Sequence, residues 1–519
     1  MLINSPHCIW TVIRIGAILL LIVTCGSYFL PHRYDAPPAL RIPSFRVANL
    51  TETSSTFNKT VVAFWQELAS AILTSQPLCE PLTVLDESIH HPEDHFDPLE
   101  PYRKHPQRLV DFTDDDETAL LRAHYAMRRS ALHLAPKLAF AKGTTGIVTT
   151  ADTHYMPVFL VSLRMLRRTG CNLPVEVFID DWSKYDTTTC DIVMPSLNAR
   201  CVVLSNIYNK NKLVKKPDHY QYKILSILFS TFQHVLFLDS DAFPAYDPSV
   251  LFTTPPYTTH GLVTWPDFFA LTVSEHFYHI AGIPEEPASA RYSTESGQLL
   301  LNKDIQRESL LMMVYYNYYG PDYYYPLLCQ GSHGVGDKET FVQAAMAVGL
   351  PWYQVRTEPG ALGRNWNGTF RGIGIAQADP GLDYEYGLPM RSHIHPGALW
   401  ENKDLAHPNA KVEKVLNRTR IAPRKPRPVF IHQNILKLNP EKVLKDKSDI
   451  TFEPDGTMHR MWGSKEDMEK QLGYDVERRL WDVIAEEGCR LDQGSETCKE
   501  IRAYVREVFG WMDSIDRPW

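Results

Sequence analysis

The sequence predicts an α/β fold whose central sheet is built from βαβ units. Three short apolar segments read as strands and one segment has helical periodicity; the strands are 146–150, 175–179 and 201–205, and the helix is 155–169. A second helical segment opens at Lys223 and leads into VLFL at 235–238, an apolar run typical of a strand buried on both faces. A further strand is expected at 261–265. Strands that alternate with helices in this way predict a βαβ sheet.

Composition places the chain among ordinary globular proteins. It has 519 residues, of which 44% are hydrophobic and 22% charged, so it can bury a large core. Its formal net charge is -8, and no long stripe of Lys and Arg occurs along it. Because a protein that binds a phosphate backbone needs such a basic surface, we expect no nucleic-acid partner.

The first thirty residues contain an apolar segment long enough to cross a bilayer. Residues 9–30 read IWTVIRIGAILLLIVTCGSYFL and carry one charge, Arg14. About 20 apolar residues span a hydrocarbon core of about 30 Å. A single-span, uncleaved signal anchor behind a cytosolic tail of residues 1–8 is therefore expected, and a cleaved signal peptide ending near Cys25 is the alternative.

Glycosylation sequons and cysteines favour a lumenal body. Four N-x-S/T triplets lie on the C-terminal side of the apolar segment, at Asn49, Asn58, Asn367 and Asn417. Nine cysteines fit an oxidising compartment, and Cys489 and Cys498 are close enough in sequence to close a small loop. Seven of the nine follow the apolar segment, so at least one thiol there is expected to be free.

Three further segments follow the anchor. Residues 31–116 are rich in Pro and polar residues and read as a stem and N-terminal extension, with helical periodicity over 61–75. The main α/β body is expected over 117–438, and it opens with a helical stretch at 117–134. Residues 439–519 are charged and helical in pattern, so they are expected to form an accessory C-terminal helical extension.

Two aspartates stand where the strand at 235–238 ends. In open α/β sheets ligands bind at the carboxyl ends of strands, which is where Asp239-Ser240-Asp241 lies. Two carboxylates one residue apart can serve one hard cation, with Asp241 as a direct ligand and Asp239 reaching a water or a ribose hydroxyl. Such a cation would bridge a diphosphate. The alternative is an ordinary turn, because Asp and Ser commonly end strands.

Several longer motifs accompany this one. They are VLFLDSDAFPAYDPSVLF at 235–252, TWPDFF at 264–269, ESGQLLL at 295–301, YYNYYGPDYYYPLLCQGSHG at 315–334, GVGDKETF at 334–341 and FIHQN at 430–434. Together, over residues 143–434, they resemble the fungal Golgi α-mannosyltransferase family that extends mannan and N- or O-linked mannose chains. The Asp-x-Asp part is shared by many glycosyltransferases, whereas the tyrosine-rich stretch followed by GDKE is far more specific.

The resemblance implies an architecture and an activity. The body at 117–438 would be a GT-A-like, Rossmann-type nucleotide-sugar-binding domain on a type II, single-pass Golgi membrane anchor. The activity would be retaining transfer of mannose from GDP-mannose to a mannose hydroxyl of a mannose-terminated glycan, with Mn²⁺ as the metal. DSDAFP and GDKETF favour the α-1,2 branch of the family over the α-1,3 branch. Other mannosyltransferases are expected as complex partners.

Position and the resemblance together assign roles to residues, since Thr149 and Thr150 end the first strand and Lys223 opens the helix before the Asp-x-Asp strand. The metal ligands would be Asp239, Asp241 and His432. The donor-binding residues would be Thr149, Thr150, Lys223, Asp239, Trp265, Asp267 and Gln298. The catalytic residues at the sugar end would be Asp337, Glu339 and Glu295, because a carboxylate stabilises an oxocarbenium-like state. For GDKE the competing interpretation is a helix N-terminus with Asp337 as its N-cap.

The tyrosine-rich stretch is expected to be mostly core. Its tyrosines, with Trp265 and Trp352, could form a surface on which mannose rings stack; the tyrosines are 315, 316, 318, 319, 323, 324 and 325. We expect two or three of them to contact sugar.

Two other functions fit the same residues. A transferase for a UDP-hexose would keep the metal site, because Asp-x-Asp recognises the diphosphate and not the base. A lumenal glycan-binding or assembly subunit without turnover would keep the fold, although the presence of Asp239, Asp241, Asp337 and His432 argues against it.

Overall fold

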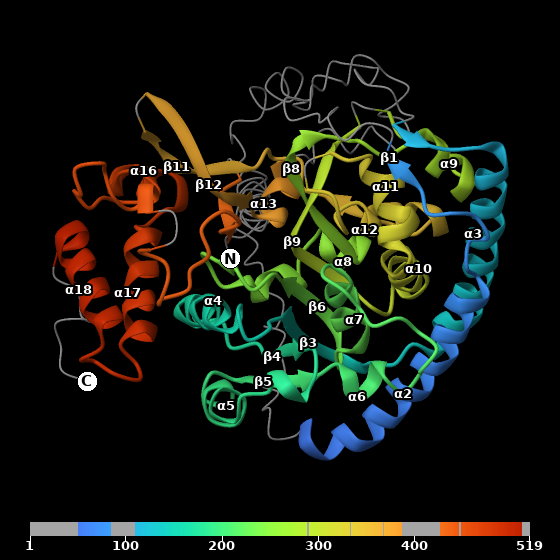
Figure 1. Cartoon of the computed structure of the whole chain (residues 1–519), viewed down its shortest axis with the longest axis horizontal. Helices are drawn as coiled ribbons and strands as arrows, with labels where there is room; N and C mark the ends of the chain where they lie inside the picture. Colours follow the sequence, from blue (N-terminus) through green and yellow to red (C-terminus); the bar gives the residue numbers. More distant parts are fainter. Residues whose placement is uncertain are drawn as a thin grey trace, which may run out of the picture. The chain divides into compact units, whose positions relative to one another are not determined.

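The computed structural model confirms a mixed α/β fold built on a seven-stranded sheet (Figure 1). The strands lie in the order β10-β8-β9-β6-β3-β4-β5. Their bounds are β3 Ala141–Thr150, β4 Val175–Ile179, β5 Ala199–Val203, β6 Phe232–Leu238, β8 Leu262–Ala270, β9 Tyr292–Asn302 and β10 Tyr353–Gln354. All neighbouring pairs are parallel except those of β9, which runs antiparallel to both β6 and β8. The start of β9 therefore lies at the carboxyl edge of the parallel strands.

A second, antiparallel sheet of four strands lies in the order β11-β12-β13-β7. Its strands are β7 Ala242–Pro244, β11 Gly360–Trp366, β12 Thr369–Ala378 and β13 Pro428–His432. Strand β7 begins one residue after Asp241, and β13 pairs with it so that His432 faces Ala242. This pairing joins the end of the main body to the strand exit at Asp239-Ser240-Asp241.

Helices cover the sheets, and a small β1–β2 ladder (Thr83–Val84 with Val110–Asp111) lies apart from them. The N-terminal and central helices are α2 Leu50–Thr74, α3 Asp114–Leu134, α4 Met156–Arg168, α5 Met194–Ser196, α6 Ser205–Tyr208, α7 Gln221–Phe229, α8 Tyr257–His260 and α9 Glu275–Ala281. The later helices are α10 Arg307–Tyr318, α11 Tyr325–Cys329, α12 Thr340–Val348, α13 Pro380–Tyr386, α16 Lys465–Leu472, α17 Val476–Gly488 and α18 Glu496–Phe509.

The helix expected within the stem segment is part of the folded body. Helix α2 buries Phe64, Trp65 and Leu68 in the same hydrophobic cluster as the main sheet. The indole of Trp65 donates to the carbonyl of Tyr208, 3.0 Å away. The extension at 31–116 therefore contributes at least this helix to the core.

The C-terminal helices share a hydrophobic core with the main body. Helix α17 buries Trp481 and Ile484 against Val161 and Met165 of α4, and Arg164 of α4 forms ion pairs with Glu486, at 2.6 Å, and with Glu487. Figure 1 shows α17 and α18 as adjacent red helices. The predicted helical character of 439–519 is confirmed, and its helices pack on the body through buried contacts.

The structure describes residues 50–84, 109–287, 290–332, 334–366, 368–386, 426–445 and 448–510. The predicted cytosolic tail, the span at 9–30 and the sequons at Asn49, Asn367 and Asn417 lie outside these residues. Asn58 is described and is exposed on α2. Within the described ranges, no helix combines the length and the apolar character that a membrane span needs.

Most predicted strands and helices are confirmed, with shifted ends. The strand expected at 201–205 is β5 (Ala199–Val203), because its pairing with β4 begins at Ala199. The strand expected at 235–238 begins at Phe232, because Phe232 and His234 already pair with β3. Periodicity identifies these elements, whereas the ladder to a neighbouring strand determines their ends.

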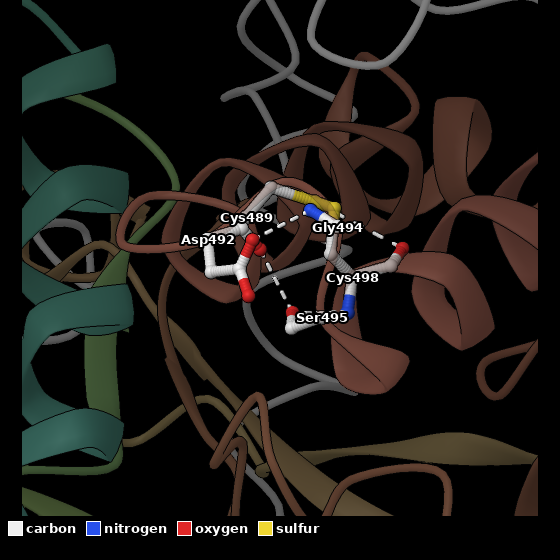
Figure 2. The surroundings of a disulfide bond; sticks show 5 residues. All are labelled: Cys489, Asp492, Gly494, Ser495 and Cys498. Carbon is white, nitrogen blue, oxygen red and sulfur yellow. Dashed lines mark hydrogen bonds between the residues drawn. A yellow bond between two sulfur atoms is a disulfide. The ribbon is translucent and has the colours of Figure 1, made fainter.

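Two disulfides are present among the described residues. Cys489–Cys498 confirms the predicted small loop, and Cys190–Cys201 is an additional bond. Of the cysteines that the structure describes, Cys79, Cys171 and Cys329 are free. Figure 2 shows the Cys489–Cys498 loop, where the Asp492 side chain accepts from the amide of Gly494 at 2.8 Å and its carbonyl accepts from the Ser495 hydroxyl.

Replacing both Cys489 and Cys498 by Ser is expected to lower the free energy of unfolding by about 2–3 kcal/mol, because the bond restricts a short loop of the unfolded chain. Denaturant unfolding followed by tryptophan fluorescence measures the change. Cys79→Ser is the control, since Cys79 is a free cysteine. An equal loss of stability in the control and the double variant would contradict the prediction.

Candidate active site

A cavity of about 960 Å³ lies at the carboxyl edge of the main sheet. Its wall contains Thr150 from the end of β3, Asp180 just beyond β4, and Asp239 just beyond β6. The antiparallel strand β9 contributes residues near its start, and the second sheet closes one side with Ile375 and His432. The carboxyl edge of an open α/β sheet is where such folds bind ligands.

Three predicted metal ligands meet in this cavity. Asp239, Asp241 and His432 each offer one ligand atom, and these atoms lie within 4.8 Å of one another. Nε2 of His432 is 3.3 Å from Oδ1 of Asp241. The β7–β13 pairing explains this meeting, because it sets His432 opposite Ala242 and lets the amide of Gln433 donate to the carbonyl of Asp241 at 2.9 Å. Residues 191 positions apart in sequence are thus brought together.

A buried carboxylate orients the histidine. Nδ1 of His432 is 2.8 Å from Oε1 of Glu295, and the amide of Gly297 donates to the same oxygen at 2.7 Å. A Cβ atom at Gly297 would lie 2.5 Å from Nδ1 of His432, so the ring can pack here only against glycine. Metal-binding histidines are commonly held by a carboxylate on their other nitrogen. Glu295, predicted as catalytic, therefore positions His432.

The ammonium group of Lys223 lies between the carboxylates of Asp239 and Asp337. Its Nζ donates to the carbonyl of Ser296 at 2.7 Å and lies 3.4 Å from Asp239 and 3.3 Å from Asp337. The hydroxyl of Ser296 donates to Oδ1 of Asp337 at 3.1 Å. These contacts bring predicted donor-binding and catalytic residues together. Asp337 does not act as an N-cap, because α12 begins at Thr340 and its N-cap residue is Glu339.

The charges in the cavity shift one another's pKa values. Burial raises the pKa of Asp239 to about 6, although the positive charges of Lys223 and His432 lower it. Burial alone would also raise the pKa of Asp241, but His432 and Lys437 outweigh it and hold that pKa below its usual value. Burial favours neutral His432, yet the Glu295 and Asp241 carboxylates outweigh it and raise the pKa of His432 well above its usual value.

Two more predicted residues line the cavity and four do not. Thr150 and Asp267 are in its wall, and Lys338 lies 3.4 Å from Asp267. Burial raises the pKa of Asp267, opposed chiefly by Lys338. The four that are buried outside the lining are Thr149, Trp265, Gln298 and Glu339.

Three of the four buried residues have hydrogen bonds that support the cavity wall. The indole of Trp265 donates to the carbonyl of Ala378 at 2.9 Å, and Gln298 donates to Oε2 of Glu295. Glu339 accepts from Arg291 at 2.8 Å and from the amide of Thr294 at 2.6 Å. The structure therefore corrects the direct donor-binding role expected of Trp265 and Gln298 and the catalytic role expected of Glu339, because their side chains are committed to buried partners. Thr149 is buried, one position before Thr150 in the wall.

The tyrosine-rich stretch lies in the core. Tyr315, Tyr316 and Tyr324 are fully buried in the main hydrophobic cluster. The seven tyrosines of the stretch are absent from the cavity lining, as is Trp352. The expectation that the stretch is mostly core is confirmed, whereas the expected contact of two or three of these aromatic side chains with sugar finds no tyrosine of the stretch in this cavity.

Among the lining residues that sequence reasoning missed, three carry charged or polar groups into the cavity wall. Lys437 forms an ion pair with Asp241, and Tyr220 is 50% exposed in the wall. Asp180 follows the buried strand β4 in the same way that Asp239 follows β6. A search for acids at every strand exit would have found Asp180. Nothing in the sequence distinguishes Lys437 from other exposed lysines.

The donor set fits a divalent transition metal. Two carboxylates and one imidazole within reach of one ion suit Mn²⁺, which accepts both oxygen and nitrogen ligands. Lys223 and Lys437 add positive charge on either side of the aspartates. A cavity with a cation site and two ammonium groups can bind a diphosphate, so fold and site are those expected of a glycosyltransferase.

Similarity to known proteins agrees with this class. A family model described as "Mannosyltransferase putative" matches residues 144–292 and 287–379. Alpha-1,2-mannosyltransferase MNN21 of Candida albicans is 32% identical over 78% of this chain and 67% of its own length. Alpha-1,2-mannosyltransferase MNN22 of the same organism is 29% identical over 85% of this chain and 86% of its own length. The chain belongs to the fungal α-mannosyltransferase family, and it is a glycosyltransferase.

Among solved structures, the galactosyltransferase LgtC in complex with donor and acceptor sugar analogs matches over 40% of this chain and 73% of its own chain. The sequence identity is 14% and the TM-score is 0.27. A likeness this low carries no conclusion about fold or function.

Mn²⁺ affinity is expected to weaken as the pH falls. Histidine binds metals only as the neutral imidazole, and the pKa of His432 is raised, so binding must displace a proton. Below the raised pKa of His432, and down to about pH 6.5 where Asp239 is still ionised, affinity should fall about tenfold per pH unit. Isothermal titration in buffers of different ionisation enthalpy measures the proton release. His432→Ala should bind Mn²⁺ weakly and with little pH dependence. If the Mn²⁺ affinity of the native protein does not change with pH, the assignment of His432 as a ligand is contradicted.

Proposed function

We propose that this protein is a metal-dependent, retaining α-mannosyltransferase that transfers mannose from GDP-mannose to a mannose hydroxyl of a glycan, forming an α-1,2 linkage. The observation that carries the proposal is the meeting of Asp239, Asp241 and His432 in a cavity of about 960 Å³. The relatives' names, alpha-1,2-mannosyltransferases, support the sugar and the linkage. The site at the carboxyl edge of a mostly parallel sheet supports a GT-A-like domain.

The end of the cavity beside β3 and β4 suits a nucleoside. Its wall combines apolar Phe178 and Leu204 with the carboxylate of Asp180 and the ammonium of Lys184. Guanine presents two adjacent donors, N1–H and the N2 amino group, and a carboxylate can accept from both. Uracil presents one donor between two carbonyl oxygens, which a carboxylate repels. Lys216 pairs with Oδ2 of Asp180 at 2.7 Å and holds the carboxylate at the cavity wall, where it supports a guanine nucleotide over a uracil nucleotide.

The middle of the cavity suits the diphosphate. Mn²⁺ held by Asp239, Asp241 and His432 would act as a Lewis acid on the leaving nucleoside diphosphate. Lys437, already beside Asp241, and Lys223, beside Asp239, hold positive charge where the leaving group gains negative charge.

The sugar end suits an electron-poor anomeric carbon. Asp337 lines the wall there, and Ser296 and Lys223 hold its carboxylate in place. Asp267 lies nearby in the lining, with Lys338 as its partner. A fixed carboxylate stabilises the positive charge of an oxocarbenium-like transition state. We assign this role to Asp337, because its oxygens are oriented by two separate partners.

The same proposal includes a Golgi-lumenal location and a single-pass anchor at 9–30. It also includes mannose-terminated acceptor glycans and other mannosyltransferases as partners. One disulfide in the main body and one in the C-terminal extension support an oxidising compartment. The exposed sequon at Asn58 is compatible with glycosylation there.

Purified protein with GDP-mannose, Mn²⁺ and short mannosides is expected to give a mannosylated product, whose linkage NMR would identify as α-1,2. Asp241→Ala should abolish Mn²⁺-dependent transfer, by about 10³-fold or more, because it removes a ligand and leaves Lys437 unpaired. Thermal unfolding should show that the variant remains folded. The control is Asp218→Asn, since Asp218 is an exposed acid in the same lining.

Two results would redirect the proposal. Transfer from UDP-hexoses with no use of GDP-mannose would assign the site to another nucleotide-sugar. Glycan binding without any transfer, and unchanged by Asp241→Ala, would indicate a non-catalytic lumenal subunit.

Asp180→Asn is expected to raise the KM for GDP-mannose about tenfold, because an amide oxygen replaces a carboxylate that accepts two guanine donors. Its effect on kcat should be smaller, since the base is remote from the breaking bond. Steady-state kinetics with GDP-mannose and with UDP-hexoses measures the change in preference. Asp218→Asn should change neither constant. Equal effects of the two variants would contradict the prediction that Asp180 recognises guanine.

A further inference from the structure

The β11–β12 hairpin has one end in the active-site wall and the other outside it. Near the base of the hairpin, Ala361, Gly372, Gly374 and Ile375 line the cavity. In Figure 1 the hairpin extends beyond the main sheet as a long orange ribbon. The base of the hairpin is thus part of the cavity wall, and its outer residues lie beyond the wall.

The register of the β11–β12 pair determines which outer side chains of the hairpin lie on the same face as the residues that line the cavity. A β-bulge between Leu362 and Gly363 shifts the pairing, so that Gly363 faces Gly372 and Asn365 faces Phe370. Paired residues of an antiparallel ladder share a face with the pairs two positions along. Phe370 therefore lies on the same face as Gly372, and its ring is 3.6 Å from the place of a Cβ at Gly372. Because Phe370 is 49% exposed, it presents an aromatic surface next to the cavity.

The opposite face of the hairpin is tied to the C-terminal segment. Arg364 donates to Glu453 at 2.6 Å, and Arg371 forms an ion pair with Asp449. The guanidinium groups of Arg364 and Arg371 lie 4.7 Å and 5.3 Å from the ring centre of Trp366. These contacts hold the hairpin in one orientation. They also give the C-terminal extension a role, because it supplies both carboxylates.

The bulge requires glycine. A Cβ atom at Gly363 would lie 1.8 Å from the carbonyl oxygen of Arg371, so no other residue allows the strands to close there. Bulges increase strand twist and redirect the side chains beyond them. The chain thus uses Gly363 to turn the outer part of the hairpin, and Phe370 with it.

We propose that this hairpin is an acceptor-binding arm, on which Phe370 stacks against a sugar ring of the acceptor glycan beyond the mannose that reacts. This inference rests on the proposed function, because it assumes a glycan acceptor. The apolar C–H face of a hexose packs well on an aromatic ring, and single exposed aromatics without a neighbouring site need no such explanation. Continuity with the cavity through Gly372 distinguishes Phe370 from them. The arm selects oligosaccharides over monosaccharides.

Kinetics with acceptors of increasing length test the arm. Phe370→Ala is expected to raise the KM for mannotetraose about tenfold and to leave unchanged the KM for methyl mannoside and for GDP-mannose. Phe370→Trp should restore the native value, because it keeps an aromatic surface. Tyr125→Ala is the matched control, since Tyr125 is an aromatic on α3 that is 61% exposed and lies outside the cavity lining.

Two outcomes would overturn the inference. One is an equal rise in KM for methyl mannoside and mannotetraose, and the other is no change for either acceptor. Isothermal titration of mannotetraose into the native protein and Phe370→Ala gives a readout that needs no turnover. If the native protein binds mannotetraose more tightly than the variant but transfers nothing from GDP-mannose, the arm stands and the proposed function fails.

Discussion

The site depends on a buried series of ionic contacts, in which Glu295 contacts one ring nitrogen of His432 and Asp241 contacts the other. These residues come from the antiparallel strand β9, from β13 and from the exit of β6, so the contact joins the two sheets. Gly297 makes it possible, since any side chain there would occupy the place of the imidazole. Gln298 and Gln377 donate to the other oxygen of Glu295, which leaves its carboxylate little freedom. The Glu295 carboxylate keeps its geometry because both of its oxygens accept hydrogen bonds.

Much of the chain outside the main sheet serves to hold this arrangement. The second sheet carries His432 to the strand exit, and the C-terminal helices pack on α4 and on the second sheet through one hydrophobic cluster. The buried ion pairs of Arg291 with Glu286 and Glu339 brace the loop that bears Asp337. Removing one partner from such a pair leaves an uncompensated buried charge, which is costly. Residues remote from the cavity therefore influence it by position rather than by contact.

A site residue could be predicted from the sequence only where a local pattern marks its position. Asp239 and Asp241 were identifiable because an apolar run ends directly before them, and strand exits are where ligands bind. Trp265, Gln298 and Glu339 lie in motifs beside cavity residues, but they face buried partners. A motif does not reveal which of two adjacent side chains points into the cavity, because alternate residues of a strand point to opposite faces. The tyrosines were expected to be mostly core, and the tertiary packing of α10 and its neighbouring segments decides that none of them lines the cavity.

The sequence by itself determined the α/β class, most of its strands and helices, the aspartate pair and the family, because local periodicity and short motifs are encoded within a few residues of one another. Tertiary structure decided that His432 lies against Asp241, that Lys437 accompanies it, and that Glu295 orients the imidazole. It also decided the exposure of Phe370 beside the cavity. These features depend on strand register and on pairings between distant segments, which local patterns do not specify. The aspartates were therefore visible in the chain, whereas the site around them exists only in the fold.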